Sequence, residues 1–486
     1  LVGSEMCIRD RLFARVKAVY DARATLGLDG EATRLVEDYY ERFVRAGANL
    51  TEEQKTKIRA LNEEQSTLTN KYQQNLMAMK DQIAVYVDTK EELAGLSEAE
   101  ITAAAEGAKA KGKEGKFIIE ITNTTRQPAL ASLENREVRK KVWKASAYRG
   151  TSGETDNQPI VARLAQLRAE RAKLLGYDNW ATYQLEPTMA KTPKAVLDMF
   201  GSMVPAVVEN TKKEAEAIQA MIKETGGDFE LQPWDWEFYA EKVRKAKYDL
   251  DEAQVREYFE FERVLNDGMF YTMNKLFGIT MKARPDLPVY HPDVKAYEVF
   301  DADGTSIAIF YADYFARDGK RGGAWMSSFV EQSKLLNQKP VVVNVMNIPK
   351  GPAGEPTLVS YDNVTTMFHE FGHAVHGLFS DVTYPALAGT SVSRDFVEFP
   401  STFQEDWAAH PDVIGNYAKH YKTGEAIPAE LLAKIMKSRS FNQGYDTLEY
   451  MSSALLDMEW HSLPADAPLQ DVQKFEAAAL KKHGVD

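Results

Sequence analysis

Residues 367–377 read MFHEFGHAVHG and contain two histidines four residues apart, His369 and His373, with Glu370 between them. An α-helix turns by about 100° and rises by about 1.5 Å per residue, so the two histidines share one face and can reach one ion. Gly372 leaves room beside His373 for another backbone. Apolar residues recur at helical spacing, namely Val364, Phe368, Phe371, Val375 and Leu378. The segment is therefore predicted to be a helix that packs on one face and borders a cleft on the other.

This HExxH spacing is typical of zinc sites that hydrolyse amide bonds. In such sites the two imidazoles bind the ion, and the glutamate is the general base that takes a proton from water. We therefore expect His369 and His373 to be zinc ligands and Glu370 to be catalytic. The alternative is that the histidines are ordinary buried residues, hydrogen-bonded within a helical core.

A third zinc ligand is required, because catalytic zinc usually takes three protein ligands. His376 lies seven residues from His369, about 10 Å along the helix, which is too far for three imidazoles to share one tetrahedral ion. The extended pattern HExxHxxGxxH is excluded, since this chain has His376 and Phe379 where that pattern needs Gly and His. Glu398 remains: it stands in an apolar run before Pro400, which marks a helix start or kink. A buried glutamate needs a partner, and zinc would supply it.

Glu405 follows Glu398 by seven residues. It has two interpretations, which the sequence leaves equally open. It is either an outer partner of the metal site or an exposed carboxylate on a helix.

The segment His369–His373, followed by GTSVSRDFVEFPS at residues 389–401, resembles the thimet oligopeptidase family of zinc metallopeptidases. Supporting stretches are PWDWEFYAEKVRKAKYDLDE at 233–252, VYHPDVKAYEVFD at 289–301 and FYADYFARDGKRGGAWM at 310–326. After the metal site, WAAHP and HYKTGEAIP continue the similarity. The resemblance covers most of the chain from residue 12 onward, and within the family it is closest to the bacterial peptidyl-dipeptidases.

The resemblance implies that His369, His373 and Glu398 hold one Zn²⁺ per chain and that Glu370 activates water. It implies a mostly α, two-lobed, zincin-type fold with a small β-sheet beside a deep channel. Such a channel admits short unstructured peptides and excludes folded proteins. The implied reaction releases C-terminal dipeptides; an endo-oligopeptidase of the same family and an inactive peptide-binding fragment remain as alternatives. The substrate-binding residues are not identifiable from the sequence.

Three regions are expected along the chain. Residues 1–11, LVGSEMCIRDR, match nothing in the family and are interpreted as a non-native segment, with a genuine short tail as the alternative. Residues 12–130 are expected to be an N-terminal helical region. Residues 131–486 are expected to be the catalytic domain without its C-terminal part, because no segment rich in Gly and Tyr follows Glu398. In the family that segment stabilises the oxyanion, and loss of one such donor costs about 10² to 10³ in rate. We therefore expect zinc binding with weak or absent turnover.

The composition is that of a large globular chain, with 44% hydrophobic and 27% charged residues among 486. A net charge of −13 argues against a nucleic-acid partner. The sequence has no apolar run of the roughly 18 residues that a membrane span needs, so no membrane partner is expected. The only cysteine is Cys7, which excludes a disulfide framework. We expect a monomer in the cytoplasm, with the periplasm as the alternative.

Three further segments have predicted structures. Residues 31–79 are expected to form two amphipathic helices, broken near 47–51, where Asn49 or Thr51 caps the second. Residues 117–122, FIIEIT, are expected to form a short strand. Residues 339–348, KPVVVNVMNI, are expected to form a strand beside the cleft. That strand is either an edge that pairs with a peptide substrate or a buried central strand.

Overall fold

The computed structural model describes residues 2–121, 127–250, 252–317, 320–351 and 354–485. They form mostly helices with a small mixed sheet, as predicted. Two compact units are present, each built from segments that are distant in the sequence. The first unit comprises Leu1–Asn49, Pro187–Met189 and Leu250–Met436, and the second comprises Leu50–Glu186, Ala190–Asp249 and Lys437–Asp486. The boundaries proposed above at residues 11 and 130 stay predictions.

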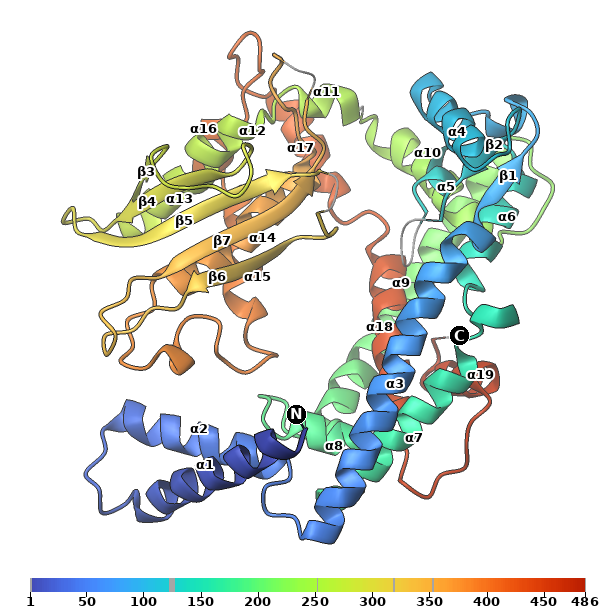
Figure 1. Cartoon of the computed structure of the whole chain (residues 1–486). Helices are drawn as coiled ribbons and strands as arrows, with labels where there is room; N and C mark the ends of the chain where they lie inside the picture. Colours follow the sequence, from blue (N-terminus) through green and yellow to red (C-terminus); the bar gives the residue numbers. More distant parts are fainter. Residues whose placement is uncertain (1, 122–126, 251, 318–319, 352–353, 486) are drawn as a thin grey trace. The chain divides into compact units, whose positions relative to one another are not determined.

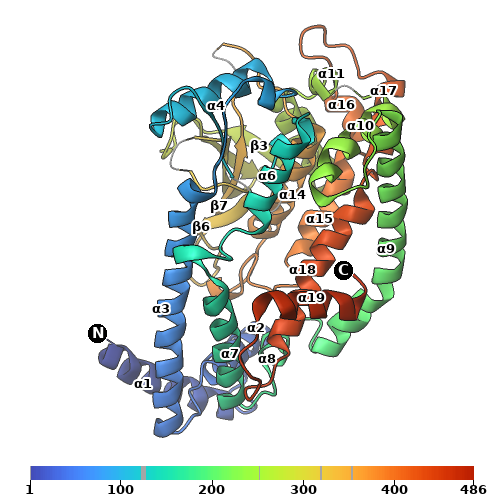
Figure 2. The same ribbon diagram turned by 90° about the vertical axis from the view of Figure 1, so that its right-hand side faces the viewer.

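Long helices dominate the second unit. Helix α9 (Pro193–Glu224) packs along α18 (Gln443–His461), and α3 (Glu52–Ile83) packs on α7 (Gln158–Leu174) (Figure 2). The unit's other helices are α4 (Glu98–Ala110), α5 (Ala129–Ser132), α6 (Arg136–Ala147), α8 (Trp180–Leu185), α10 (Trp236–Tyr248) and α19 (Val472–His483), with short 3-10 turns at Glu91–Leu93, Gly153–Thr155 and Pro233–Asp235. Across the described ranges, no helix combines the length and the apolar character that a bilayer crossing requires.

Two local predictions are confirmed near the start of the chain. Helix α2 (Gly30–Arg45) ends shortly before α3, and Thr51 is the residue that caps α3. The Thr51 hydroxyl accepts from the backbone N–H of Gln54 at 3.3 Å, while the Gln54 side chain accepts from the backbone N–H of Thr51 at 3.0 Å. Strand β2 (Phe117–Ile119) pairs antiparallel with β1 (Val85–Val87), so the predicted strand is present but shorter than 117–122: residues 120 and 121 are not part of it, and residue 122 lies outside the described residues.

A five-stranded sheet forms the centre of the first unit, with the strand order β3-β4-β5-β7-β6. The strands are β3 (Thr280–Ala283), β4 (Lys295–Phe300), β5 (Ser306–Phe315), β6 (Trp325–Val330) and β7 (Val341–Ile348). The predicted strand at 339–348 is therefore present as β7. The edge interpretation of that strand is wrong, because β7 pairs in parallel with β5 and antiparallel with β6. Its run of apolar residues reflects burial on both faces. The two edge strands of the sheet are β3 and β6, and β6 is the one next to β7.

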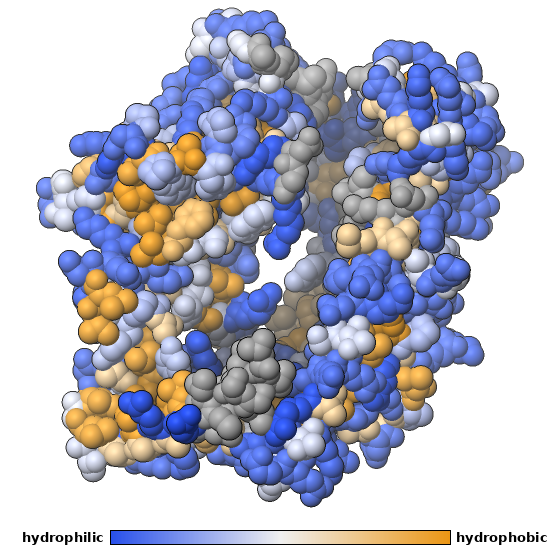
Figure 3. All heavy atoms as spheres, in the orientation of Figure 1, coloured by the Kyte–Doolittle hydropathy of each residue, from blue (hydrophilic) through white to orange (hydrophobic). Residues whose placement is uncertain are grey.

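One face of this sheet is covered by the helix that contains His369 and His373. Helix α14 (Tyr361–Leu378) packs across β5, β6 and β7, and α15 (Glu398–Ala408) packs along α14 (Figure 1). Hydrophobic side chains remain visible over the region of the sheet in the space-filling view (Figure 3), and Phe329 on β6 is 58% exposed. The unit's remaining helices are α1 (Val2–Ala22), α2, α11 (Glu252–Arg256), α12 (Phe261–Arg263), α13 (Tyr271–Phe277), α16 (Pro411–Tyr417) and α17 (Ala429–Ser438), with a π-helical turn at Val264–Phe270 and a 3-10 turn at Pro385–Leu387.

Candidate metal centre

Helix α14 is the element on which the HExxH residues lie. Its first turn is capped by Ser360, whose hydroxyl accepts from the backbone N–H of Asn363 at 3.1 Å. The predicted apolar stripe is buried throughout, since Val364, Phe368, Phe371, Val375 and Leu378 are each at most 8% exposed. The helix therefore forms because one face is buried against the sheet, and this burial fixes the direction in which the opposite face points.

A buried asparagine joins the sheet to this helix at the position of the predicted base. The Asn344 side chain on β7 is fully buried and donates to the backbone carbonyl of Glu370 at 2.8 Å. Its own carbonyl accepts from the Tyr314 hydroxyl at 3.4 Å. Sequence reasoning did not identify Asn344, although a polar residue inside a β-branched run is a signal that it has a specific partner.

Gly372 allows α15 to approach α14 closely, as the sequence predicted. A Cβ atom at this position would lie 2.6 Å from the carbonyl oxygen of Pro400 and 2.7 Å from Cα of Ser401. Both atoms belong to the backbone of α15, so neither can move aside without moving that helix. Any side chain at residue 372 would therefore push the first turn of α15, which carries Glu398, away from the histidines.

This close approach brings the three predicted metal ligands together. Glu398 Oε2 lies 3.3 Å from Nε2 of His369 and 3.1 Å from Nε2 of His373. One ligand atom from each of the three residues lies within 4.8 Å of the others. Their assignment as zinc ligands stays a prediction, because proximity alone does not show an ion.

The structure corrects one expectation about Glu398. The sequence analysis expected a buried carboxylate, but the Glu398 side chain is 58% exposed. The apolar run around it is itself exposed, with Phe399 at 64% and Phe403 at 54%. The neighbours of Glu398 in the sequence were therefore a poor guide to its burial, because they do not face the core of this unit.

Two further side chains hold the ligand residues in place. Glu405 Oε1 lies 2.7 Å from Nδ1 of His369, which is the contact expected of an outer partner rather than of a free surface carboxylate. Ser401, which is fully buried, donates from its hydroxyl to Oε2 of Glu398 at 2.8 Å. With Nδ1 of His369 engaged by Glu405, Nε2 is the nitrogen left for an ion. Sequence reasoning did not identify Ser401, although its position three residues after Glu398 on a predicted helix indicated that the two side chains could meet.

Burial shifts the ionisation of the groups on α14. Burial, together with the negative charge of Glu398, raises the pKa of Glu370 to about 7, although His369 opposes the shift. Burial also lowers the pKa of His373, which favours the neutral imidazole that binds metal. Burial alone would raise the pKa of Glu398, but the Ser401 hydroxyl and the two histidines outweigh it and lower that pKa.

The donor set fits a zinc ion. Catalytic zinc is bound by nitrogen and carboxylate oxygen at about 2.0 to 2.2 Å, so ligand atoms around a tetrahedral ion lie roughly 3.3 Å apart. The two separations from Oε2 of Glu398 to the histidine Nε2 atoms, 3.1 and 3.3 Å, agree with that value. Oε2 of Glu370 is buried and has no hydrogen-bond partner among the described residues. A buried carboxylate oxygen in this state is suited to a molecule bound in the site rather than to a structural contact.

Two histidine nitrogens and one carboxylate, beside a buried glutamate whose Oε2 has no hydrogen-bond partner among the described residues, are the arrangement of a metallopeptidase centre. The chain belongs to peptidase family M3, whose sequence profile matches residues 129–485. It is 48% identical over 486 residues to dipeptidyl carboxypeptidase of Escherichia coli and covers 71% of that protein. It is 47% identical to dipeptidyl carboxypeptidase of Salmonella typhimurium and covers 72% of it. Oligopeptidase A of Escherichia coli is 32% identical over 438 residues, which are 88% of this chain and 64% of that protein. The family resemblance predicted from the motifs is confirmed.

Proposed function

We propose that this chain is a zinc-dependent peptidase that releases dipeptides from the C-terminus of short, unstructured peptides. In this proposal His369, His373 and Glu398 hold one zinc ion and Glu370 is the general base. Two dipeptidyl carboxypeptidases that are 48% and 47% identical to this chain support the choice of reaction. The single observation that carries the proposal is the set of three ligand atoms within 4.8 Å of one another, next to a buried glutamate.

Zinc bound by these residues would supply a Lewis acid to the peptide carbonyl and to a water molecule. Glu370 takes a proton from the attacking water and gives it to the leaving amine. Its Oε2, which has no partner among the described residues, is the atom available to hold that proton. Asn344 fixes the backbone at Glu370 through the bond of 2.8 Å, and Glu405 fixes the ring of His369 through the contact of 2.7 Å. These contacts reduce the reorganisation that the proton transfers would otherwise require.

The free edge of β6 offers a place for the substrate backbone. β6 is an end strand of the sheet, and among the described residues it pairs with β7 alone. Its residue Met326 lies opposite Asn344, which is bonded to the carbonyl of Glu370. An extended peptide that adds to this edge would therefore pass beside α14, and main-chain hydrogen bonds would bind it without regard to its sequence.

The reaction is tested with one heptapeptide made in two forms, with a free C-terminal carboxylate and with a C-terminal amide. Mass spectrometry of the products from the zinc-loaded chain should show dipeptides released from the free acid, with the amide largely intact. Equal cleavage of both forms at internal bonds would instead support an endo-oligopeptidase, the second candidate that the oligopeptidase A relative favours. Binding of both peptides without cleavage would support the peptide-binding alternative.

The proposal also takes the chain to act as a monomer in the cytoplasm. Sedimentation velocity should give a single species near the chain mass of 54.6 kDa. Fractionation of the producing cells should recover the chain with cytoplasmic markers, and recovery with periplasmic markers would support the alternative compartment.

A further inference from the structure

A cavity of about 580 Å³ lies at the C-terminal end of helix α14, within the first unit. Its lining includes Leu378 and Phe379 at the end of that helix, Gln332 after β6 and Asp301 in the turn between β4 and β5. Leu378 follows His373 by five residues, which is about 7.5 Å along the helix axis, so the cavity is separate from the metal centre. Its volume is that of a site for a small molecule or for one or two residues of a peptide.

Gln332 brings a hydrogen-bond donor without a partner to this cavity. The residue is 8% exposed, and its Oε1 accepts from the backbone N–H of Val382 at 2.8 Å and from the Ser380 hydroxyl at 3.4 Å. Because the N–H of Val382 can only donate, the amide oxygen is the atom on that side, and Nε2 donates to no group of the described residues. A largely buried amide nitrogen is costly unless it is bonded, so Nε2 is available to an acceptor in the cavity.

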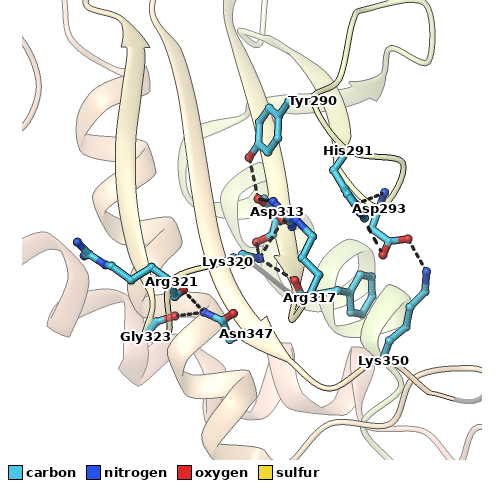
Figure 4. Close-up of polar contacts among 11 residues, drawn as sticks. Tyr290, His291, Asp293, Asp313, Arg317, Lys320, Arg321, Gly323, Asn347 and Lys350 are labelled. Carbon is cyan, nitrogen blue, oxygen red and sulfur yellow. Dashed lines mark hydrogen bonds and ion pairs between the residues drawn. The ribbon is translucent and has the colours of Figure 1, made fainter. Parts of the chain in front are cut away.

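Asp301 has no cationic partner, unlike the carboxylates at the other end of the same two strands. Strands β4 and β5 form an antiparallel hairpin, and Asp301 lies in its turn. At the opposite end, Asp313 accepts from two basic side chains, and Asp293 is paired with Lys350 (Figure 4). Across the described ranges Asp301 takes part in no ion pair, and its Oδ1 accepts from the backbone N–H of Ala302 at 2.7 Å. Its negative charge is therefore available to a cation in the cavity.

The other charges around the cavity leave this negative charge uncompensated. Asp381, which also lines the cavity, is paired with Lys334 at 2.8 Å. Lys339 contributes to the lining as well, but its charge acts on Glu298 of β4. The C-terminal end of α14 adds partial negative charge, because the carbonyl groups of a helix point toward that end. The cavity therefore favours a cationic ligand.

Two partly exposed aromatic rings form the apolar part of the lining. Phe277 is 43% exposed and Phe379 is 38% exposed. Their ring centres are 5.0 Å apart, and the rings are nearly perpendicular, with an angle of 86° between their planes. Such a pair packs well against a further aromatic or large apolar group, and the face of a ring also attracts a nearby cation.

We propose that this cavity binds the free amino end of a short peptide whose first residue is aromatic. The ammonium group pairs with Asp301 at the negative end of α14, and the first carbonyl accepts from Nε2 of Gln332. The first side chain packs on Phe277 and Phe379. An ammonium, a carbonyl and an apolar group joined through one carbon atom are the groups of an N-terminal residue, which is why this ligand fits better than a simple amine. The cavity is thus a peptide site apart from the metal centre, and it does not depend on zinc.

The test is a titration of the full chain, without added zinc, followed by saturation-transfer NMR of the ligand. The main probe is phenylalaninamide, which has the ammonium, the carbonyl and the ring but no carboxylate. It should bind about tenfold more tightly than N-acetylphenylalaninamide, which lacks the ammonium, and about fivefold more tightly than 2-phenylethylamine, which lacks the carbonyl.

Two variants assign the ammonium to its partner. In Asp301→Asn the bond to the N–H of Ala302 can be kept while the charge is lost, so phenylalaninamide and its acetylated form should bind equally. Asp303→Asn is the matched control, because Asp303 is an exposed carboxylate of the same turn whose bond to the N–H of Thr305, 2.8 Å long, an asparagine can also accept. This control should leave the tenfold difference unchanged.

The other outcomes each overturn the proposal. If the acetylated probe binds as tightly as phenylalaninamide, or if no probe binds, the cavity does not hold an amino end. If Asp301→Asn keeps the preference for the ammonium, or if Asp303→Asn loses it as well, Asp301 is not its partner. Equal binding of 2-phenylethylamine and phenylalaninamide would mean that Gln332 holds no carbonyl and that the site takes any aromatic amine. None of these measurements needs zinc or turnover, so failure here would leave the proposed peptidase function standing.

Discussion

Two carboxylates in the first unit are buried to a similar extent, but their pKa values are shifted in opposite directions. Asp313 is 2% exposed and Glu370 is 5% exposed. Burial alone would raise the pKa of Asp313, but hydrogen bonds from Arg317, Lys320 and Tyr290 outweigh burial and lower that pKa to about 2. Burial and the negative charge of Glu398 raise the pKa of Glu370 to about 7, although His369 opposes the shift.

The difference distinguishes a carboxylate that holds structure from one that is available for chemistry. Every oxygen of Asp313 is used by the fold, so its charge is stabilised in the folded state. Glu370 is instead held by its backbone, through Asn344, while one side-chain oxygen has no partner among the described residues. Such a group costs stability and is retained where a bound molecule uses it.

The largest expected effect is on Glu370. Glu370→Gln should reduce peptide hydrolysis by about 10³-fold while zinc binding is kept, because the amide cannot accept the proton of water. Turnover and zinc content measured on the same sample check this. Glu430→Gln, a change at an exposed carboxylate of α17, is the matched control and should alter neither. Loss of zinc from Glu370→Gln would mean that Glu370 acts as a structural partner of the site.

The same substitution should stabilise the metal-free protein at high pH. The Glu370 carboxyl ionises near pH 4.3 when unfolded and near pH 7 when folded. Between these values the folded state binds more protons, so stability falls as the pH rises. At pH 8 the metal-free Glu370→Gln protein should therefore be about 3 kcal/mol more stable than the unsubstituted protein, with no gain at pH 4. Urea unfolding at both pH values measures this, and a loss of stability at pH 8 would contradict the comparison.

Asp313→Asn should have the opposite effect on stability. It leaves the buried ammonium of Lys320, which is 4% exposed, without its charged partner, and we expect a cost of about 3 kcal/mol at pH 7. The Asp313 carboxyl ionises near pH 2 when folded and near pH 3.9 when unfolded. Its contribution is thus present above pH 4 and is lost as the pH falls toward 2. Asp286→Asn, a change at a carboxylate that is 61% exposed and paired with Arg284, should change stability little. Equal losses of stability in Asp313→Asn and Asp286→Asn would contradict a special structural role for Asp313.

Gly372→Ala tests whether the metal centre depends on the close approach of two backbones. The new Cβ would lie 2.6 Å from the carbonyl oxygen of Pro400, so α15 must move. We expect a loss of about 2 kcal/mol in stability and a clear weakening of zinc binding. In Gly201→Ala, the matched control within helix α9, the new Cβ meets no atom within 4 Å, and it should be neutral or stabilising by up to about 1 kcal/mol. Unchanged zinc affinity in Gly372→Ala would contradict the account of how Glu398 is placed.

The smallest of these effects is expected at Glu405. Glu405→Ala removes the carboxylate bonded to Nδ1 of His369, and zinc affinity should fall about tenfold, at the lower end for an outer partner. Competition with a zinc chelator measures this change. Asp406→Ala, a change at the exposed neighbour on α15, should leave the affinity unaltered. If Glu405→Ala and Asp406→Ala bound zinc with similar affinity, Glu405 would be an ordinary surface carboxylate and not an outer partner of the site.

The sequence predicted those parts of the site that depend on local periodicity. Helix α14 and its buried stripe follow from apolar spacing, and the role of Gly372 follows from the absence of a side chain there. Long-range contacts were not predictable: the bond from Asn344 to Glu370 joins residues 26 apart, and the apolar run at 339–348 left the choice between an edge and a central strand open. Burial of Glu398 was mispredicted because an apolar neighbourhood in the sequence does not report which way a short helix faces.

The most direct test of the central claim is the zinc content of the purified chain, measured by elemental analysis beside that of Glu398→Ala. The account predicts one zinc ion per chain, lost or bound at least tenfold more weakly in the variant, because only two nitrogen ligands remain. Full zinc content in Glu398→Ala, or no zinc in either protein, would contradict a site formed by two histidines and one glutamate.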